Sequence, residues 1–365
     1  MGSCSMSKKA DRNIHIESNI NNDHSYAIGS MMGWHSIMED RNVAILYNHF
    51  SYFAVFDGHG GATCSNYCAE NLHNNILRQK LFDEDIPKAI EKGFLITDQN
   101  LSRLTDLKTN GTTALCSIIT RGNIYIANCG DSKGLLYNGG VSFLTQAHKP
   151  NLLAEKERIN NAGGIVSNAR INWGHGSLGV SRALGDFELK QKNGLTQCQQ
   201  ILSPLPDVEK IQRTGKEEFL ILATDGVWDV FTNDALCQYI QNRLFITDDL
   251  AEIVTQVIDT CYYKGSTDNI TLVLICFPNC PKPTLEAKYA EKLLDDTIEI
   301  CFREIFEQNP DQDYYGILRK LYWEKNIPNL PPGGGIQAKR KWIDTLYSRY
   351  NPTYDISEFT CSRIN

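Results

Sequence analysis

The chain has 365 residues, more than one hydrophobic core usually supports, which predicts one large domain and a smaller appendage. Its fractions of hydrophobic residues, 42%, and charged residues, 22%, are ordinary for globular proteins and exclude both wholesale disorder and a protein built mainly of membrane spans. The net charge of −7 and the pI near 5.7 give no global basic field, so nucleic acid is not expected as a partner.

Residues 1–22 are rich in Asn, Ser and charged side chains without hydrophobic periodicity, which predicts a flexible N-terminal segment. This segment lacks the apolar stretch of a signal peptide, and no later apolar run is long enough to cross a bilayer. We therefore expect a protein of the cytoplasm, with the nucleus as a second candidate location. Its 12 cysteines show no paired CxxC spacing and are expected to be reduced thiols.

The first residues also carry a candidate lipidation signal. Gly2 stands where a myristoylated glycine would, Cys4 offers a palmitoylation site, and Lys8 and Lys9 add a basic contact. Two weak anchors together can hold a protein on a membrane. The myristoylation pattern has Ser or Thr at position six, where this chain has Met6, so an unmodified disordered tail is the alternative. Peripheral membrane association is expected only if the chain is lipidated.

Residues 23–278 show short strand-like apolar runs separated by turns rich in Gly, Asn and Asp, with a few helical patterns between them. Hairpin-length turns and helices grouped between sets of strands indicate antiparallel sheets covered by helices, the α+β class. The predicted strands are Val43–Tyr47, Tyr52–Phe56, Ala114–Ile119, Ile124–Cys129, Gly134–Tyr137, Phe219–Thr224 and Ile270–Phe277. The predicted helices are Ala62–Arg78, Pro87–Leu104, Leu152–Asn161, Asp234–Leu244 and Asp249–Tyr262.

After residue 278 the character of the sequence changes. A proline-punctuated linker begins there, and only helical periodicity follows it. This predicts a C-terminal helical domain over 279–350 and a loose tail over 351–365. The helical patterns cover Leu285–Gln308, Tyr314–Lys325 and Ile336–Arg349.

Three acids stand next to apolar strands. Asp57 and Asp225 each end a strand and precede a glycine, and Asp268 comes directly before the last predicted strand. An acid at the end of a buried strand is costly unless something neutralises it. If the sheets are antiparallel, an acid before one strand and acids after others lie at the same edge.

Further acids fall close to strand ends, and their number suggests a bound cation. The candidates are Glu39, Asp40, Asp131 and Asp229. Taken singly, each Asp-Gly pair is more simply a turn signal. Taken together at the ends of buried strands, the acids would repel one another, which favours a site for a hard cation with oxygen ligands, Mg²⁺ or Mn²⁺.

His59 follows Asp57 and Gly58 and is itself followed by two glycines. These glycines permit a close approach, so the imidazole can reach past the metals toward a substrate. A histidine near its ordinary pKa of about 6.5 is suited to giving a proton to a leaving alkoxide. A surface histidine without a role is the alternative.

With these residues located, the sequence resembles, motif by motif and in order, the type 2C metal-dependent protein phosphatases (the PPM family). The helical tail, with Asn326–Gly334, resembles the C-terminal domain of the alpha and beta animal members, and the resemblance covers nearly all of residues 24–352. The matching segments are Gly33–Asp40, Phe56–Gly61, Gly111–Ala114, Gly130–Ser132, Leu178–Asp186, Ala223–Asp229 and Asp268–Asn269.

The resemblance implies a fold and an activity. The fold is a central β-sandwich of two antiparallel sheets flanked by helices, in four layers αββα, with a small all-α C-terminal domain. Residues 23–278 would then be the catalytic domain. The activity is hydrolysis of phosphoserine and phosphothreonine in phosphoprotein substrates.

The resemblance also implies roles for the acids. Asp57 would bridge two Mg²⁺ or Mn²⁺ ions, the Gly58 carbonyl and Glu39 would serve one ion, and Asp225 and Asp268 the other. Asp131 and Asp229 match positions that hold a weaker third cation. Asp40, next to Glu39 in the sequence, stays a further candidate ligand from its place before a strand. In this scheme a water between the two cations attacks phosphorus directly, and His59 protonates the departing oxygen.

Three features near the motifs leave questions open. The family usually has an arginine where this chain has His35; a histidine offers fewer donors and a pH-dependent charge, so weaker phosphate binding is expected. Arg182 is a second candidate for the substrate phosphate, with a structural ion pair to an acid such as Asp186 as the alternative. The stretch 172–176 is longer than usual in the region resembling the flap, so either substrate choice differs or the loop is a variable surface.

A catalytically impaired scaffold that binds metals and phosphoproteins is the alternative function, and only His35 suggests it. A small-molecule phosphatase is a weaker alternative because the helical tail resembles members that act on proteins. The sequence shows no coiled coil or exposed dimer seam, so a monomer is expected.

Overall fold

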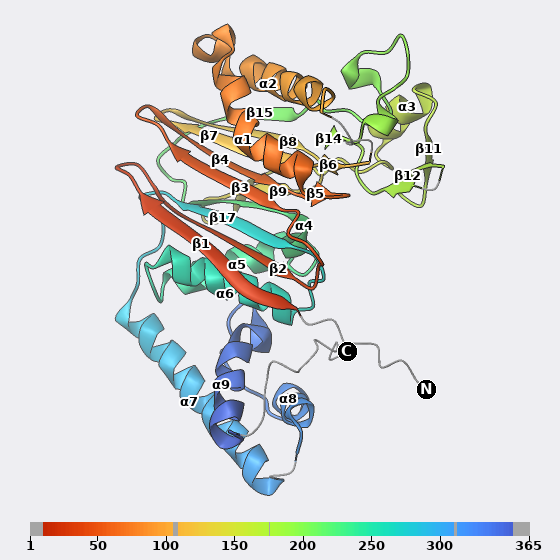
Figure 1. The fold of residues 1–365 in the computed structure, drawn as a ribbon. Coiled ribbons are helices and arrows are strands. Elements are labelled where there is room, and N and C mark those ends of the chain that lie inside the picture. Colours follow the sequence, from red (N-terminus) through yellow and green to blue (C-terminus); the bar gives the residue numbers. More distant parts are fainter. Residues whose placement is uncertain (1–9, 105–108, 175, 310–311, 353–365) are drawn as a thin grey trace, which may run out of the picture.

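The computed structural model describes residues 10–104, 109–174, 176–309 and 312–352. Two β-sheets lie face to face at the centre, helices cover the outer face of each sheet, and three more helices extend from one side (Figure 1). This arrangement confirms the predicted α+β class, the four layers and the C-terminal helical region. The predicted lipidation site, Gly2 and Cys4, lies outside the described residues.

The first sheet has six strands, and all neighbours in it are antiparallel. In spatial order its strands are β1 (Asp11–Ile20), β2 (Ser25–Gly33), β17 (Ile270–Cys276), β16 (Phe219–Ala223), β9 (Lys133–Tyr137) and β10 (Val141–Leu144).

The second sheet has five strands, also all antiparallel. In spatial order they are β15 (Asp207–Gln212), β8 (Asn123–Cys129), β7 (Ala114–Thr120), β4 (Phe50–Phe56) and β3 (Arg41–Leu46). All seven predicted strands are thus confirmed to within a few residues.

The strands of the centre are apolar along their whole length because both faces of each sheet are covered. On β4, Phe53 and Val55 point into the core between the sheets, whereas Tyr52, Ala54 and Phe56 pack against the helices on the other face. This alternation follows from the two-residue period of a strand. A strand buried on both sides has no polar face to present to water.

Two helices cover each sheet. On the second sheet lie α1 (Thr63–Leu77) and α2 (Ile86–Leu101), and on the first lie α5 (Asn233–Leu244) and α6 (Leu250–Tyr263) (Figure 1). Helix α6 packs closely on β2 at a glycine: a Cβ at Gly29 would lie 2.5 Å from side-chain atoms of α6. The predicted helices of the large domain are confirmed.

The C-terminal helices have a core of their own, built from apolar residues on their facing sides. The helices are α7 (Leu285–Gln308), α8 (Tyr314–Trp323) and α9 (Arg340–Tyr350), with a short 3₁₀ helix, Gly335–Lys339, before α9. Helix α9 and this 3₁₀ helix contact α6, which joins the appendage to the outer face of the first sheet. Among the helices of the described residues, none has both the length and the apolar character needed to cross a bilayer.

A smaller lobe lies beside one end of the sandwich (Figure 1). It contains α3 (Leu153–Asn161), which is followed by Gly163 with a left-handed φ of +88°, the helix stop that the sequence predicts. The remaining short elements are β11 (Ile165–Ser167), β12 (Arg170–Trp173) and β13 (Gly176–Leu178) in one sheet, β14 (Leu184–Gly185), β6 (Gly111–Thr112) and β5 (Gly58–His59) in another, the helix α4 (Asp225–Trp228), and the 3₁₀ helices Lys80–Asp83, Phe187–Leu189 and Gln197–Gln199.

The prediction that residues 1–22 are flexible is wrong for Asp11–Ile20, which form β1 along the edge of the first sheet. Most side chains of β1 are exposed, so the strand is held by its backbone pairing with β2 instead of by a buried apolar face. Hydrophobic periodicity detects only strands with such a face. The exposed strand β15 escaped prediction for the same reason.

Candidate metal centre

Three carboxylates converge at one end of the sandwich. Asp57 follows β4, Asp131 lies in the turn between β8 and β9, and Asp225 opens α4 directly after β16. One carboxylate oxygen of each lies within 4.8 Å of the others. The antiparallel sheets therefore bring together acids that are up to 168 residues apart, as the positions 57 and 225 show.

The electrostatics of the cluster show that it needs a counter-charge. Burial, and then the charges of Asp225 and Asp40, raise the pKa of Asp57 well above its ordinary range. Burial, followed by Asp131 and Asp268, raises the pKa of Asp225 to about 8. Lys149 offsets part of the charge, because its Nζ lies 2.5 Å from Asp131 Oδ2. These carboxylates resist ionisation when no counter-charge is present. Their oxygens are the ligands that a hard divalent cation prefers, so a bound cation would stabilise their charged form.

Glu39 is held next to this cluster by backbone contacts. Its N–H donates to Asn269 Oδ1 at 2.8 Å, and its carboxylate accepts a hydrogen bond from the N–H of Gly61. A Cβ at Gly58 would lie 2.5 Å from the carbonyl oxygen of Glu39, so only glycine fits there. The backbones of Glu39 and Gly58 therefore pack closely together, and their roles as metal ligands stay a prediction.

Asp40 has a different position. Its Oδ2 accepts a hydrogen bond of 2.8 Å from Thr224 Oγ1, the residue before Asp225. Burial, with a contribution from the charge of Asp268, raises the pKa of Asp40 to about 7. Asp40 is therefore tied to the turn that places Asp225.

Asp229 and Asp268 lie at the exposed rim of the site. Neither belongs to the tight group that the described residues form, although both carry charge that acts on Asp225. Burial, and then the charges of Asp131 and Asp268, raise the pKa of Asp229, while Lys149 opposes that shift. These two predicted ligands therefore lie near the cluster but outside the group of carboxylates whose oxygens are within 4.8 Å of one another.

His59 lies in β5 beside the cluster and forms an ion pair that the sequence did not predict. Its Nε2 lies 2.6 Å from Asp186 Oδ2. Burial disfavours the charged imidazole, but the charge and hydrogen bond of Asp186, together with the charges of Asp131 and Glu39, raise the pKa of His59. Asp186 has a left-handed φ of +50°, unusual for a residue with a side chain. That strain could not be recognised from the sequence.

Arg182 forms ion pairs with structural acids, as the alternative interpretation expects, but Asp186, the example given for such an acid, is wrong. The Arg182 guanidinium binds Glu155 Oε1 at 2.7 Å and Asp207 Oδ1 at 2.7 Å instead of Asp186. It also donates to the carbonyl of Leu205. These acceptors occupy the N–H groups of Arg182 that a substrate phosphate would need. The geometry therefore favours a structural role for Arg182.

The two acids that pair with Arg182 connect it to the metal centre through Asp207 and to the small lobe through Glu155. His148 joins Asp207 to the metal-site turn: its Nε2 lies 3.0 Å from Asp207 Oδ2, and its Nδ1 accepts from the N–H of Gly130, which precedes Asp131. On the other side, Glu155 accepts a hydrogen bond of 2.7 Å from Arg158.

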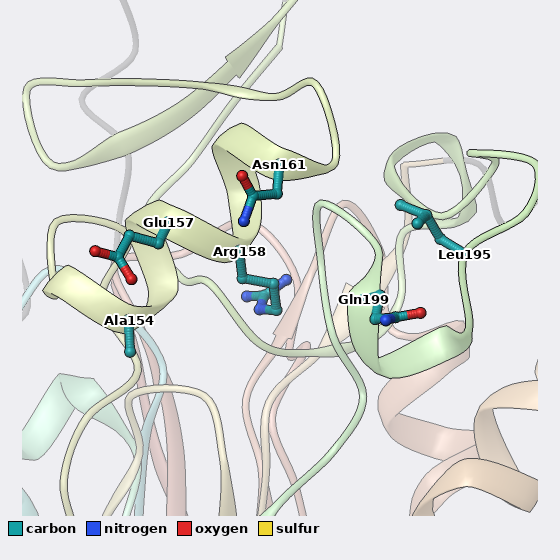
Figure 2. Close-up of a pocket in the computed structure, with 6 residues that line it drawn as sticks. All are labelled: Ala154, Glu157, Arg158, Asn161, Leu195 and Gln199. Carbon is teal, nitrogen blue, oxygen red and sulfur yellow. The ribbon is translucent and has the colours of Figure 1, made fainter.

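Arg158 lies at the base of a pocket of about 360 Å³ between α3 and the segment 195–199 (Figure 2). None of the metal-site acids lines this pocket, which is therefore separate from the carboxylate cluster. Its lining residues are Ala154, Glu157, Arg158, Asn161, Leu195 and Gln199.

His35 lies at the rim of the site, as the position of the family's arginine suggests. Its Nδ1 donates to the carbonyl of Ile37 at 3.1 Å and lies 3.6 Å from Glu39 Oε2. The side chain is 36% exposed, so it faces solvent beside the carboxylates.

Most substitutions of buried residues lower the stability of a protein, but replacing one carboxylate of the cluster should raise the stability of the metal-free protein. Asp225→Asn removes a repulsive charge, so the metal-free protein should gain about 1 kcal/mol, or roughly 2–4 °C in melting temperature. With saturating Mn²⁺ the wild type should be stabilised and the variant should not. Thermal unfolding with chelator and with Mn²⁺ measures both, and Asp234→Asn, an exposed acid on α5, is the control. An equal response of Asp225→Asn and wild type to Mn²⁺ would contradict the assignment.

The Glu155 ion pairs should matter for stability. Burial opposes ionisation of Glu155, yet Arg182 and Arg158 lower its pKa from 4.5 to about 2. Glu155→Gln removes the carboxylate that Arg158 and Arg182 share, although Arg182 keeps Asp207, and should cost about 3 kcal/mol of unfolding free energy at neutral pH.

Because the folded-state pKa of Glu155 is depressed, its contribution is complete above pH 4.5 and is lost as the pH falls toward about 2. Denaturant unfolding at neutral pH and at about pH 3 should show the difference between wild type and variant shrinking. Glu157→Gln, an exposed acid on the same helix, should change stability by less than about 0.5 kcal/mol. A loss from Glu155→Gln no larger than that of this control would refute the structural role.

Comparison with known proteins agrees with this architecture. Residues 24–270 match the family model of protein phosphatase 2C, and residues 271–348 match that of the protein serine/threonine phosphatase 2C C-terminal domain. Human protein phosphatase 1A is 42% identical over 348 residues, which cover 90% of this chain and 90% of the relative. Human protein phosphatase 1B is 42% identical over 353 residues, covering 90% of this chain and 73% of the relative.

Solved structures show the same fold. A phosphatase from Toxoplasma gondii superimposes with a TM-score of 0.64 at 24% identity, covering 73% of this chain and 96% of that one. A sex-determining protein of C. elegans gives a TM-score of 0.60 at 25% identity, covering 76% and 67% of the two chains. With both family models matched along nearly its whole described length, the chain belongs to the protein phosphatase 2C family of metal-dependent serine/threonine phosphatases.

Proposed function

We propose that this protein hydrolyses phosphoserine and phosphothreonine in phosphoproteins at a site that holds two Mg²⁺ or Mn²⁺ ions, with a third bound more weakly. The observation that carries the proposal is the convergence of Asp57, Asp131 and Asp225 within 4.8 Å beside the paired His59. The family membership supports the activity.

The acids of the cluster would hold the cations. Asp57 would help to hold both ions, together with Glu39 and the Gly58 carbonyl for one and with Asp225 and Asp268 for the other. Asp131 and Asp229 would hold the weaker ion. When bound, the cations would lower the pKa of a water and offset charge on the phosphoryl oxygens.

His59 would supply the proton that the leaving oxygen needs. Its pairing with Asp186 favours the charged imidazolium. With Nε2 directed at Asp186, Nδ1 is the nitrogen that remains for the substrate. A serine or threonine alkoxide is a poor leaving group and gains much from such a proton.

His35 would contact the substrate phosphate. Its Nδ1 donates to Ile37, which leaves Nε2 to face the substrate. One donor in place of an arginine fork should give a weaker grip on the phosphate. We further propose that the substrates are cytoplasmic or nuclear phosphoproteins, with membrane-bound ones reached if Gly2 and Cys4 are acylated.

Phosphate release from a phosphothreonine peptide is the direct test. Release should require Mn²⁺ or Mg²⁺, stop with chelator and fall by at least about 10³-fold in Asp57→Asn, because the central carboxylate is lost. Asp85→Asn is a matched control, since Asp85 caps α2 and asparagine caps a helix equally well. A folded wild type that binds metal in calorimetry but releases no phosphate would favour the phosphoprotein scaffold instead.

The role of His59 predicts a dependence on the leaving group. Asp186→Asn should lower the turnover of a phosphothreonine peptide on the order of 10²-fold, because the imidazolium loses its partner. Turnover of an aryl phosphate should fall far less, since a phenolate leaves without a proton. Metal affinity measured by calorimetry should not change. Equal losses on both substrates would argue against proton donation by His59.

A further inference from the structure

The segment between β2 and Glu39 carries His35 and is fixed at both ends by one side chain. Asn269 Nδ2 donates to the carbonyl of Met32 at 2.9 Å and to that of Ile37 at 3.2 Å. Its Oδ1 accepts from the N–H of Glu39. Residues 33–38, here called the rim loop, therefore have fixed ends, and their middle needs a separate support.

Trp34 supplies that support. Its ring stacks on Tyr262 of α6, with centroids 5.7 Å apart and planes 9° from parallel. Tyr262 is 4% exposed and does not belong to the metal site. Because Trp34 directly precedes His35, the stacked position of the Trp34 ring constrains the backbone from which the His35 side chain extends.

Tyr262 and its neighbour Tyr263 are clamped by the N-terminal edge strand. The guanidinium of Arg12, in β1, lies 5.0 Å from the ring centre of Tyr262 and 5.1 Å from that of Tyr263. It also donates a hydrogen bond to the Tyr263 hydroxyl. A cation over two buried rings is a contact of fixed geometry.

The C-terminal helices also contact Tyr263, through the carboxylate of Asp344. Tyr263 donates to Asp344 of α9 at 2.5 Å, and Tyr314 of α8 donates to the other oxygen of the same carboxylate. Arg340 lies over the rings of Tyr263 and Tyr314, 4.9 and 5.5 Å from their centres. Arg12 Nη2 of β1 also lies 3.8 Å from Asp344 Oδ2, so side chains of α6, α8, α9 and β1 meet at this carboxylate. Figure 1 shows the three helices on the side of the first sheet that faces away from the second.

We propose that these contacts make the C-terminal helices a positioning element for the active site. The path runs from Asp344 through Tyr263 and Tyr262 to Trp34, and it sets the place of His35 on the rim loop. The set of Asp344, Tyr263, Tyr262, Trp34 and Arg12 is called the aromatic latch below. The C-terminal helices would then govern the affinity for the phosphorylated substrate without touching it. This proposal rests on the proposed function, in which His35 contacts the phosphate.

A double-mutant cycle in the full chain tests the latch. Asp344→Asn should raise KM for a phosphothreonine peptide about threefold to tenfold with a smaller change in kcat. Trp34→Leu should raise KM similarly, and the double variant should be no worse than Trp34→Leu alone, because the path is already cut. Tyr263→Phe, which keeps the ring and removes the hydroxyl, should reproduce Asp344→Asn and guards against misfolding of the first variant.

The matched control is Asp295→Asn. Asp295 accepts a hydrogen bond of 2.7 Å from Lys339, so the variant also removes a carboxylate partner within the C-terminal helices, but away from the aromatic latch. It should leave KM unchanged. If the fold-increases in KM of Asp344→Asn and Trp34→Leu multiplied in the double variant, the two residues would act independently and the proposal would be overturned. A rise in KM from Asp295→Asn as large as that from Asp344→Asn would overturn it as well.

Hydrogen exchange gives a readout that needs neither metal nor turnover. Amides of residues 33–38 should exchange faster in Asp344→Asn than in wild type, and Asp295→Asn should leave them unchanged. If the wild type released no phosphate, the proposed function would fail while this measurement still tested the latch. Unchanged exchange of the rim loop in both Asp344→Asn and Tyr263→Phe would overturn the latch whatever the activity.

Discussion

The architecture depends on one unfavourable interaction, the repulsion among acids that are crowded at the end of a β-sandwich. Asp57, Asp131 and Asp225 are brought within 4.8 Å of one another by strands that are themselves strongly apolar. Such an arrangement stores electrostatic energy that folding of the hydrophobic layers must outweigh. Proteins retain strain of this kind where it serves a site.

Much around the cluster can be understood as holding it in place. Asn269 fixes the backbone of Glu39, Thr224 binds Asp40, and Lys149 lies against Asp131. His148 connects the turn before Asp131 to the ion pairs of the small lobe. The contacts that support the site therefore come from both sheets and from the small lobe.

The sequence predicted the parts that have a strong local signal. Strands buried on both faces are continuous apolar runs, and the antiparallel pairing of β16 with β17 puts Asp225 and Asp268 at the same end of the first sheet. Asp57 ends β4 in the second sheet, so its approach to Asp225 also needs the face-to-face packing of the two sheets. The sequence could not predict pairings between polar side chains distant in the chain. Asp186 was offered as an example of an acid that pairs with Arg182, whereas the fold brings it to His59, 127 residues away. Glu155 and Asp207, the true partners of Arg182, had no pattern that marked them.

Strand β1 shows what the same polar character does in the folded protein. It forms one edge of the six-stranded sheet, and an edge strand offers unpaired backbone groups to any other strand that approaches. Along β1, Asp11, Arg12, His15 and Glu17 interrupt the apolar residues. Charged side chains on an edge hinder pairing between molecules. The sequence that hid this strand from hydrophobic analysis is thus suited to keeping concentrated protein from joining sheet to sheet and aggregating.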